Sequence, residues 1–277
     1  MPYGSLNISI RRCNVAALAL LFTISWAFPQ AAAAKEGVVR YTVNLADLPG
    51  AQVFAQTGVH TEDGRCTFTD EGSGPASGYG RVLVITELSF DPETCDRQLA
   101  WAEYRRDALP PSVAAKVELP ASSDRTSEEF KQTIPLGGSS QNRSGAAVRE
   151  YLGSIKVNVE DPPQLDVTTT KSSLRWSNSG SRLNTSYHTA YWDWLSQTGW
   201  RRTNAHWNYG NNGSRAYTDT YGKYRNGSFC ATVDTWTEHK KTYFEGRPYG
   251  GWKWSYSVQK WGGCSGLLHY EYIVETP

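Results

Sequence analysis

Hydrophobic and polar positions alternate along much of this chain, and the alternation predicts β-strands. From Trp252 to Trp261, aromatic and apolar residues take alternate positions over most of the segment, with lysine and serine between them. The segment Leu267–Glu275 alternates in the same way. Gly80–Phe90 is apolar on both faces for part of its length, which is typical of a strand buried on both sides. The pattern predicts a mainly β protein whose C-terminal half is an antiparallel sandwich or barrel.

Turn-forming residues predict two connections between strands. Asn226-Gly227 separates two strand-like runs, and this dipeptide is a strong signal for a two-residue hairpin turn. We expect the turn to pair the chain near Tyr224 with the chain near Phe229. The glycine-rich segment 245–251 is expected to close a second hairpin, between Thr237–Phe244 and Trp252–Trp261.

The N-terminal half is predicted to be β-rich with one or two short helices. Pro110-Pro111-Ser112 suits the start of the first helix, because proline is favoured at the first helical position. Thr126-Ser127-Glu128-Glu129 fits a capping box and predicts a second helix around Phe130. Asp91-Pro92-Glu93 indicates either a short helix or a tight turn that ends near Cys95.

Glycine, serine and asparagine dominate residues 136–145, and this composition predicts a linker or a long surface loop. We therefore expect two domains. The first is the β-rich region 35–135, and the second is the Trp- and Tyr-rich antiparallel β region 146–277.

Residues 1–34 have the features of a secretory signal peptide. Arg11 and Arg12 precede the apolar run Val15–Phe28, and Ala32 and Ala34 have the A-x-A spacing of a cleavage site. An uncleaved N-terminal anchor is the alternative. No other apolar run approaches the length of a membrane span, so we expect a secreted or extracytoplasmic protein without a transmembrane segment after cleavage.

The cysteine count agrees with export. Cys13 falls within the predicted signal peptide, and the four remaining cysteines allow two disulfides in three possible pairings. We favour the pairs that lie within one half of the chain, Cys66 with Cys95 and Cys230 with Cys264. A zinc site is the alternative, but no C-x-x-C pair or histidine doublet supports it.

Composition and motifs restrict the classes of function. A hydrophobic fraction of 39% and a net charge of +1 suit a folded globular protein and disfavour a basic nucleic-acid binder. The five histidines show no metal-ligand spacing, and no nucleotide-binding or nucleophile motif is present. We expect no metal, no cofactor and no nucleic-acid partner. Whether the protein is an enzyme stays open, with a non-catalytic protein favoured.

The segment Ser89-Phe90-Asp91-Pro92-Glu93-Thr94-Cys95 resembles a segment of uncharacterised exported bacterial proteins. In those proteins it precedes a D-P pair, a D-V pair and a Trp-rich C-terminal region. Asp161-Pro162 and Asp166-Val167 follow the same order here. The resemblance implies export and a shared fold, and it implies no catalytic residue.

Aromatic residues give the leading indication of function. Residues 171–277 hold 9 of the 11 tryptophans, together with 11 tyrosines and 2 phenylalanines. This exceeds what a small sandwich core is expected to hold, so some rings should be exposed and could stack on sugar rings of a polysaccharide or cell-envelope component. The alternative is that all of them are core residues. The candidate binding residues are Trp192, Trp194, Trp207, Trp252, Trp254, Trp261, Arg201, Asn204 and Asn208.

Two further functions stay open. A secreted hydrolase could use paired carboxylates amid the aromatics. A structural or surface protein would have no small-molecule site. Convergence of two acids in a cleft would favour the hydrolase. An exposed aromatic row would favour binding. The candidate acids are Asp193, Asp219, Asp234 and Glu238.

Overall fold

The computed structural model describes residues 38–74, 80–118, 125–136 and 148–277. The predicted signal peptide 1–34 and nearly all of the predicted linker 136–145 lie outside the described residues. These described residues form one compact unit.

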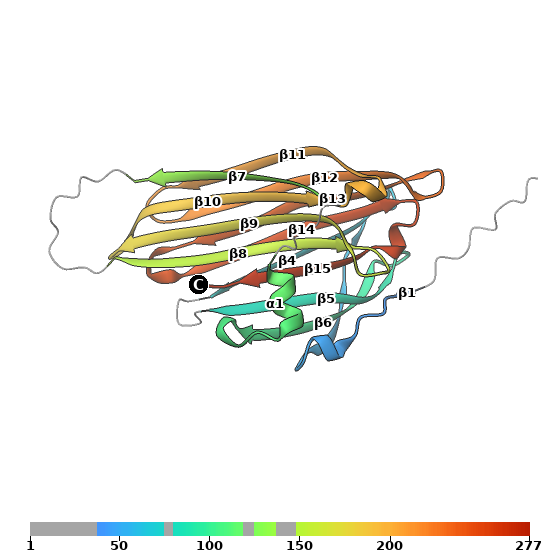
Figure 1. Cartoon of the computed structure of the whole chain (residues 1–277), viewed down its shortest axis with the longest axis horizontal. Coiled ribbons are helices and arrows are strands. Elements are labelled where there is room, and N and C mark those ends of the chain that lie inside the picture. The colour runs from blue at the N-terminus through green and yellow to red at the C-terminus, as the bar shows by residue number, and fades with distance from the viewer. Residues whose placement is uncertain (1–37, 75–79, 119–124, 137–147) are drawn as a thin grey trace, which may run out of the picture. The chain divides into compact units, whose positions relative to one another are not determined.

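Two antiparallel sheets make up this unit (Figure 1). The nine-stranded sheet has the order β2-β6-β5-β15-β8-β9-β10-β7, and β1 pairs with β5. Its strands are β1 (Val39–Arg40), β2 (Gln52–Thr57), β5 (Arg81–Asp91), β6 (Asp96–Arg105), β7 (Thr126–Pro135), β8 (Arg149–Glu160), β9 (Asp166–Ser179), β10 (Arg182–Trp194) and β15 (His269–Glu275).

The six-stranded sheet has the order β11-β12-β13-β14-β4-β3. Its strands are β3 (Val59–His60), β4 (Cys66–Gly74), β11 (Trp200–Asn211), β12 (Ala216–Cys230), β13 (Val233–Gly246) and β14 (Trp252–Gly262). The mainly β prediction is confirmed. Of the two predicted architectures for the C-terminal half, the structure shows packed sheets.

Strands from both halves of the chain contribute to both sheets. β4 pairs with β14 in the six-stranded sheet, and β5 pairs with β15 in the nine-stranded sheet. The division into domains 35–135 and 146–277 is therefore not reproduced by the strand pairing. A glycine- and serine-rich segment signals a loop, but it does not show whether the strands before and after it pair with one another.

The core lies between the inner faces of the two sheets. Its largest buried side chains are aromatic and include Trp176, Trp200, Tyr224, Tyr256 and Tyr270. A polar stripe crosses the middle of this core. The described bonds of the stripe include Thr168–Thr237 at 3.1 Å, Thr170–Thr242 at 2.7 Å and Ser172–Thr220 at 2.7 Å. These hydroxyls satisfy one another across the sheets, as buried polar groups must.

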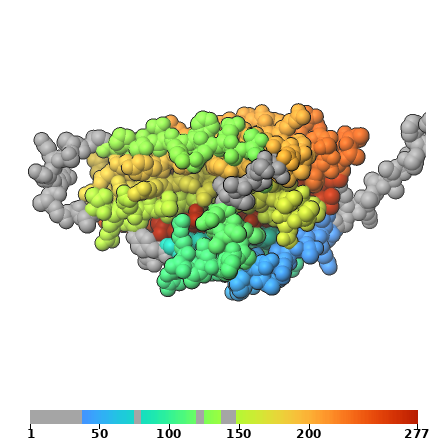
Figure 2. All heavy atoms as spheres, in the orientation of Figure 1, coloured from blue at the N-terminus to red at the C-terminus, as the bar shows by residue number. Residues whose placement is uncertain are grey.

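A second, smaller core lies on the outer face of the nine-stranded sheet. Here the α-helix α1 (Pro111–Val117) places Val113 against Val82, Val84 and Ile273. In Figure 2 the green spheres of α1 and its neighbours cover much of the red C-terminal strand. The remaining helices are single 3₁₀ turns: η1 (Leu45–Asp47), η3 (Arg106–Ala108), η4 (Ser196–Thr198), η5 (Pro248–Gly250) and η6 (Ser265–Leu267). None of the described helices has the length and apolarity to cross a membrane.

Several predicted elements are confirmed. The helix opened by Pro110-Pro111-Ser112 is α1, and the second hairpin joins β13 to β14 through 247–251. After Asp91 the chain makes a tight turn, in which Asp91 Oδ1 accepts a hydrogen bond from the Glu93 N–H at 2.9 Å.

Two predicted elements are wrong. Thr126-Ser127-Glu128-Glu129 does not open a helix but begins β7, because these residues pair in register with β10 as far as Trp194. Asn226-Gly227 is not a hairpin turn. β12 runs through it to Cys230, and the turn to β13 falls at 231–232.

The Asn226 side chain explains the second error. Its Oδ1 accepts hydrogen bonds from the N–H groups of Ser228 and Phe229 at 2.8 and 2.9 Å. Its Nδ2 donates to the Thr198 carbonyl at 2.9 Å. These bonds create an irregularity inside the strand between Asn226 and Cys230. The turn falls at 231–232, five positions beyond the dipeptide that predicted it.

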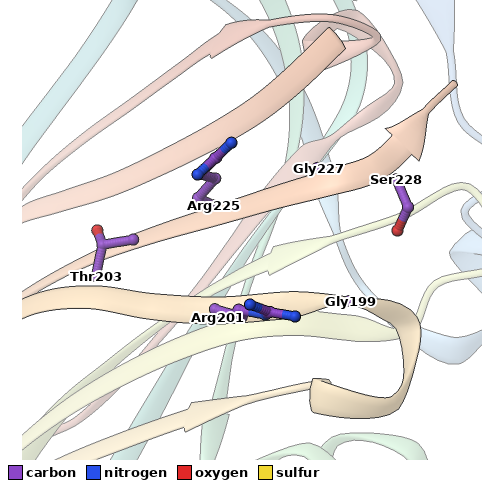
Figure 3. A pocket seen from close by; sticks show the side chains of 6 residues that line it. All are labelled: Gly199, Arg201, Thr203, Arg225, Gly227 and Ser228. Atoms are coloured by element: carbon purple, nitrogen blue, oxygen red, sulfur yellow. The ribbon is translucent and has the colours of Figure 1, made fainter. Parts of the chain in front are cut away.

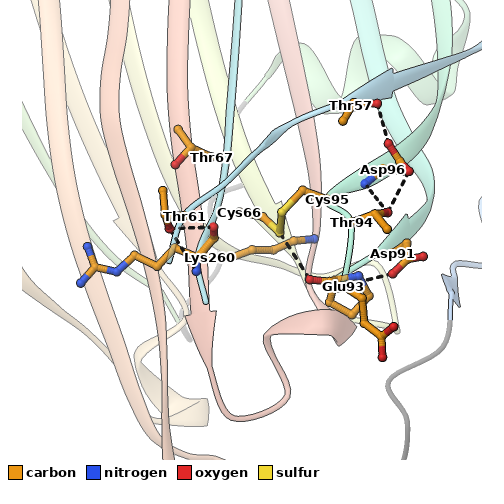
Figure 4. Close-up of a disulfide and its surroundings, with 12 residues drawn as sticks. Thr57, Thr61, Cys66, Thr67, Asp91, Glu93, Thr94, Cys95, Asp96 and Lys260 are labelled. Atoms are coloured by element: carbon orange, nitrogen blue, oxygen red, sulfur yellow. Dashed lines mark hydrogen bonds between the residues drawn. A yellow bond between two sulfur atoms is a disulfide. The ribbon is translucent and has the colours of Figure 1, made fainter. Parts of the chain in front are cut away.

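Both favoured disulfides are confirmed. Cys66–Cys95 joins β4 of the six-stranded sheet to the turn that follows β5, and it therefore links the two sheets (Figure 4). Cys230–Cys264 joins the end of β12 to the segment that follows β14. Each disulfide spans a Cα–Cα distance of 5.5 Å.

Candidate functional site

Three of the six predicted binding tryptophans are core residues. Trp192, Trp194 and Trp254 are 3%, 9% and 5% exposed. Trp192 and Trp194 are two positions apart on β10, so both point to its inner face. Trp192 Nε1 donates to the Tyr221 carbonyl at 2.7 Å. Trp254 packs over Gly72, where the absence of a side chain admits the indole. Their prediction as exposed ligand contacts is therefore wrong.

Trp207 and Trp252 are partly exposed, but they also belong to the inner side. Trp207 donates from Nε1 to Thr218 Oγ1, a buried hydroxyl, at 2.8 Å. Trp252 packs over Gly74 and against the main core. Neither ring shares a face with the polar residues that were predicted to act beside it.

The remaining four predicted residues lie on the outer face of the six-stranded sheet. Arg201, Asn204 and Asn208 are exposed on β11, and Trp261 is half-buried on β14. The register places their cross-strand partners on the same outer face, because directly paired residues point to the same side of a sheet. This face is the candidate functional site.

One register row crosses the sheet at this site, and we call it the transverse row. Arg201 pairs with Arg225, Arg225 pairs with Trp236, and Trp236 pairs with Trp261. The two indoles are stacked, with their centroids 5.9 Å apart and their planes within 2° of parallel. Arg65 closes the row, with its guanidinium 4.7 Å from the centroid of Trp261.

A second register row of hydrogen-bonding side chains lies next to the first, and we call it the polar row. Its members pair in sequence across five strands and are Asn204, Lys223, Glu238, Gln259 and Thr67. The Lys223 ammonium lies 5.1 Å from the Trp236 centroid and 5.3 Å from that of Trp261. The transverse row thus combines flat apolar rings with adjacent donors and acceptors.

Further aromatic side chains extend this face. Tyr221 donates its hydroxyl to Glu238 Oε1 at 2.8 Å, and the ring of His206 stacks on it at 4.2 Å. Burial and the neighbouring Glu238 carboxylate raise the pKa of Tyr221 well above its usual value, so this phenol stays protonated. Tyr217 and Tyr243 stack further along, with centroids 6.1 Å apart.

At one end of the transverse row the surface is hollowed by about 320 Å³. The hollow lies between Arg201 on β11 and Arg225 on β12 (Figure 3). Its other lining residues are Gly199, Thr203, Gly227 and Ser228. Arg225 is paired with Asp234 at 2.9 Å. Within the described ranges, Arg201 forms no hydrogen bond or ion pair.

Sequence reasoning missed Trp236, Lys223, Arg225 and Glu238 as members of one site. The signal that could have found them is alternation along β13. Thr235 and Thr237 are fully buried on the inner face, so Trp236 between them points to the outer face. The wrong turn at Asn226-Gly227 hid the pairing of Arg225 with Trp236.

The candidate acids for hydrolysis do not converge. Asp193 is buried on the outer face of the nine-stranded sheet, where it pairs with Arg125. Asp219, Asp234 and Glu238 lie on the outer face of the other sheet. Asp219 accepts a hydrogen bond from the Thr242 N–H at 3.1 Å, and burial raises the pKa of its carboxyl.

A different acidic group lies beneath α1. Carboxylate oxygens of Glu160, Asp166 and Glu271 fall within 4.8 Å of one another. Lys116 of α1 pairs with Glu271, and Lys156 lies 3.5 Å from Asp166, so two cations already balance this group. Burial raises the pKa of Glu160, and its neighbours Glu271 and Asp166 raise it further.

The geometry of this acidic group indicates a structural role. Glu160 and Glu271 are 3% and 0% exposed, so a substrate does not reach them in this arrangement. The bonds to Lys116 instead anchor α1 to the sheet.

Comparisons with protein families, with curated proteins and with solved structures find no match for this chain.

Proposed function

We propose that this chain is an exported, non-catalytic protein that binds a glycan through the outer face of the six-stranded sheet. The observation that carries the proposal is the parallel pair Trp236–Trp261, partly exposed and bordered by the polar row. An indole offers a flat apolar face to the faces of sugar rings, and neighbouring polar groups fix the orientation of a bound ligand.

The charge pattern agrees with a polar ligand. Lys223 and Arg225 on one side of Trp236 and Arg65 beside Trp261 surround the rings with donors. Hydroxyl groups of a glycan would accept from these cations and donate to Glu238. The register holds all of these side chains except Arg65 on rigid strands, which limits the entropy lost on binding.

Two features support export. Both disulfides are typical of oxidising compartments, and the predicted signal peptide would direct the chain there. A hydrolase has no comparable support, since Asp193 lies on the other sheet. The three acids on this face are each engaged elsewhere: Asp234 pairs with Arg225, Glu238 accepts from Tyr221, and Asp219 accepts from the Thr242 N–H.

Affinity electrophoresis through gels that contain plant, fungal and bacterial-envelope polysaccharides would test the proposal. We expect at least one polysaccharide to retard the protein, and Trp236→Ala and Trp261→Ala each to weaken that binding by about 1–3 kcal/mol if stacking on sugars resembles stacking on bases. Tyr187→Ala is the matched control, because it removes an aromatic ring that is 43% exposed on the other sheet.

Absence of retardation by every polysaccharide in the panel would count against binding and would favour a structural role. Retardation that is unchanged in both tryptophan variants would place the binding site elsewhere.

A further inference from the structure

We infer that the hollow between Arg201 and Arg225 is an oxyanion subsite, so that the bound glycan carries carboxylate or sulfate groups. The inference rests on the proposed function, because it extends the same surface at one end of the transverse row. It adds the chemical class of the ligand.

The first argument is the opposition of like charges. Arg201 and Arg225 are direct cross-strand partners, and like charges in this relation destabilise a sheet. Asp234 compensates Arg225 at 2.9 Å, whereas Arg201 has no partner among the described residues. An oxyanion between the two guanidinium groups would relieve this repulsion and accept hydrogen bonds from both.

The second argument is the shape and lining of the hollow. Gly199 and Gly227 carry no side chains, and they leave space beside the two arginines. A Cβ added to Gly227 would meet only Asp234 Oδ1, at 3.5 Å. Thr203 and Ser228 line the same space (Figure 3), but their hydroxyls already donate to the Lys223 carbonyl and to Asn226 Oδ1, so the two arginines are the donors for an anion.

The third argument is continuity with the stacked rings. The Arg225 guanidinium lies 5.7 Å from the centroid of Trp236, the cross-strand partner of Arg225. If a sugar stacks on Trp236, an acidic substituent of that sugar or of the next sugar in the polymer would therefore lie at the hollow. Carboxylate and sulfate share the oxygen geometry that the guanidinium fork recognises, so a uronic acid and a sulfated sugar are both candidates.

The experiment compares one polymer in three charge states: dextran, carboxymethyl dextran and dextran sulfate, each at 0.15 M salt. We expect at least one anionic form to bind about tenfold or more tightly than dextran. Arg201→Gln should abolish most of this preference. Arg175→Gln is the matched control, because Arg175 is an exposed arginine on the other sheet.

A second measurement is independent of the polymer. Sodium sulfate should raise the melting temperature of the wild type more than that of Arg201→Gln, with sodium chloride at equal ionic strength as the reference. Gly227→Leu should fill the hollow and have the same effect as Arg201→Gln while retaining both charges.

The outcomes separate the two proposals. Equal loss of anion preference in Arg201→Gln and Arg175→Gln, or equal responses of wild type and Arg201→Gln to sulfate, would overturn the subsite. If Trp236→Ala still weakens polysaccharide binding in that case, the proposed function stands. Loss of anion binding in Arg201→Gln, with no effect of either tryptophan variant on any polysaccharide, would support the subsite and overturn glycan stacking.

Discussion

The Lys260 ammonium lies 3.1 Å from Glu87 Oε1 in the core between the two sheets, and the two side chains are 1% and 0% exposed. The ammonium also lies 3.6 Å from the ring centroid of Phe90. Burial lowers the pKa of Lys260 to about 8, so the lysine is still largely charged at neutral pH. Burial raises the pKa of Glu87, and the charge of Lys260 opposes that rise.

This pair predicts strong non-additivity. Lys260→Met leaves the Glu87 carboxyl buried without its cation and should lower the free energy of unfolding by about 3–5 kcal/mol. Glu87→Gln leaves the Lys260 ammonium buried without its carboxylate and should lower the free energy of unfolding by a similar amount. The double variant should recover most of the loss, as measured by urea unfolding. Additive losses in the double variant would show that the two side chains do not act as a pair.

Local sequence patterns predicted β5, β14 and β15, because alternation and apolar runs reflect which faces of a strand are buried. The same patterns failed where a side chain competed with them. Asn226 forms the local bonds of an irregular strand instead of a turn, and Ala231 takes up the left-handed conformation at the true turn. β7 shows the other limit, because pairing with β10 overrides a capping-box sequence at Thr126.

The candidate site was only partly predictable for a related reason. Spacing shows that Trp192 and Trp194 share a face, and that Trp252 and Trp254 share a face, but it does not show which face meets the other sheet. That choice depends on long-range packing, in which Trp254 fits over Gly72. Trp254, Tyr256 and Val258 point inward at every second position of β14. Trp261 lies three positions after Val258, an odd number, so its side chain points to the opposite, outer face.

Asn226 should matter more for stability than Gly227, although both belong to the same dipeptide. Asn226→Ala removes a buried acceptor of two backbone N–H groups and a donor to the Thr198 carbonyl, and it should cost about 2–3 kcal/mol. Gly227→Ala should leave stability unchanged or raise it by up to about 1 kcal/mol, since Gly227 has no positive φ and space for a Cβ. Urea unfolding of the two variants measures this difference, and a larger loss at Gly227 would restore the turn interpretation.

The disulfides should contribute similar amounts to stability. Their cysteines are separated by 29 and 34 positions, which corresponds to about 3.5 kcal/mol each on the chain-entropy account. Cys230→Ala with Cys264→Ala should therefore lower the free energy of unfolding by about this amount. Intact-mass measurement after alkylation should find none of Cys66, Cys95, Cys230 and Cys264 modified without prior reduction. Modification of two or more of them would contradict the pairing.

His239 should make the protein sensitive to acid. Its two ring nitrogens lie 3.0 Å from Thr168 Oγ1 and 2.9 Å from Thr170 Oγ1, between the sheets. Complete burial lowers the pKa of this imidazole to about 3, whereas it is about 6.5 in the unfolded chain. Between these values the unfolded state binds a proton that the folded state does not. The stability contributed by the neutral form is therefore complete above about pH 6.5 and is lost as the pH falls toward 3.

Replacement of His239 by glutamine removes this proton uptake and should reduce the dependence of unfolding free energy on pH. The slope between pH 5.5 and 4 should fall by about 1.4 kcal/mol per pH unit relative to the wild type, even if the variant is less stable at pH 7. Urea unfolding at several pH values within this window gives the slope for each protein. The carboxyl groups contribute equally to both slopes, so the difference between the slopes reports the proton uptake of His239. His60→Gln provides the control for a His-to-Gln change at an exposed position. An identical slope in wild type and His239→Gln would contradict the prediction, because it would show that the imidazole takes up its proton in the folded state.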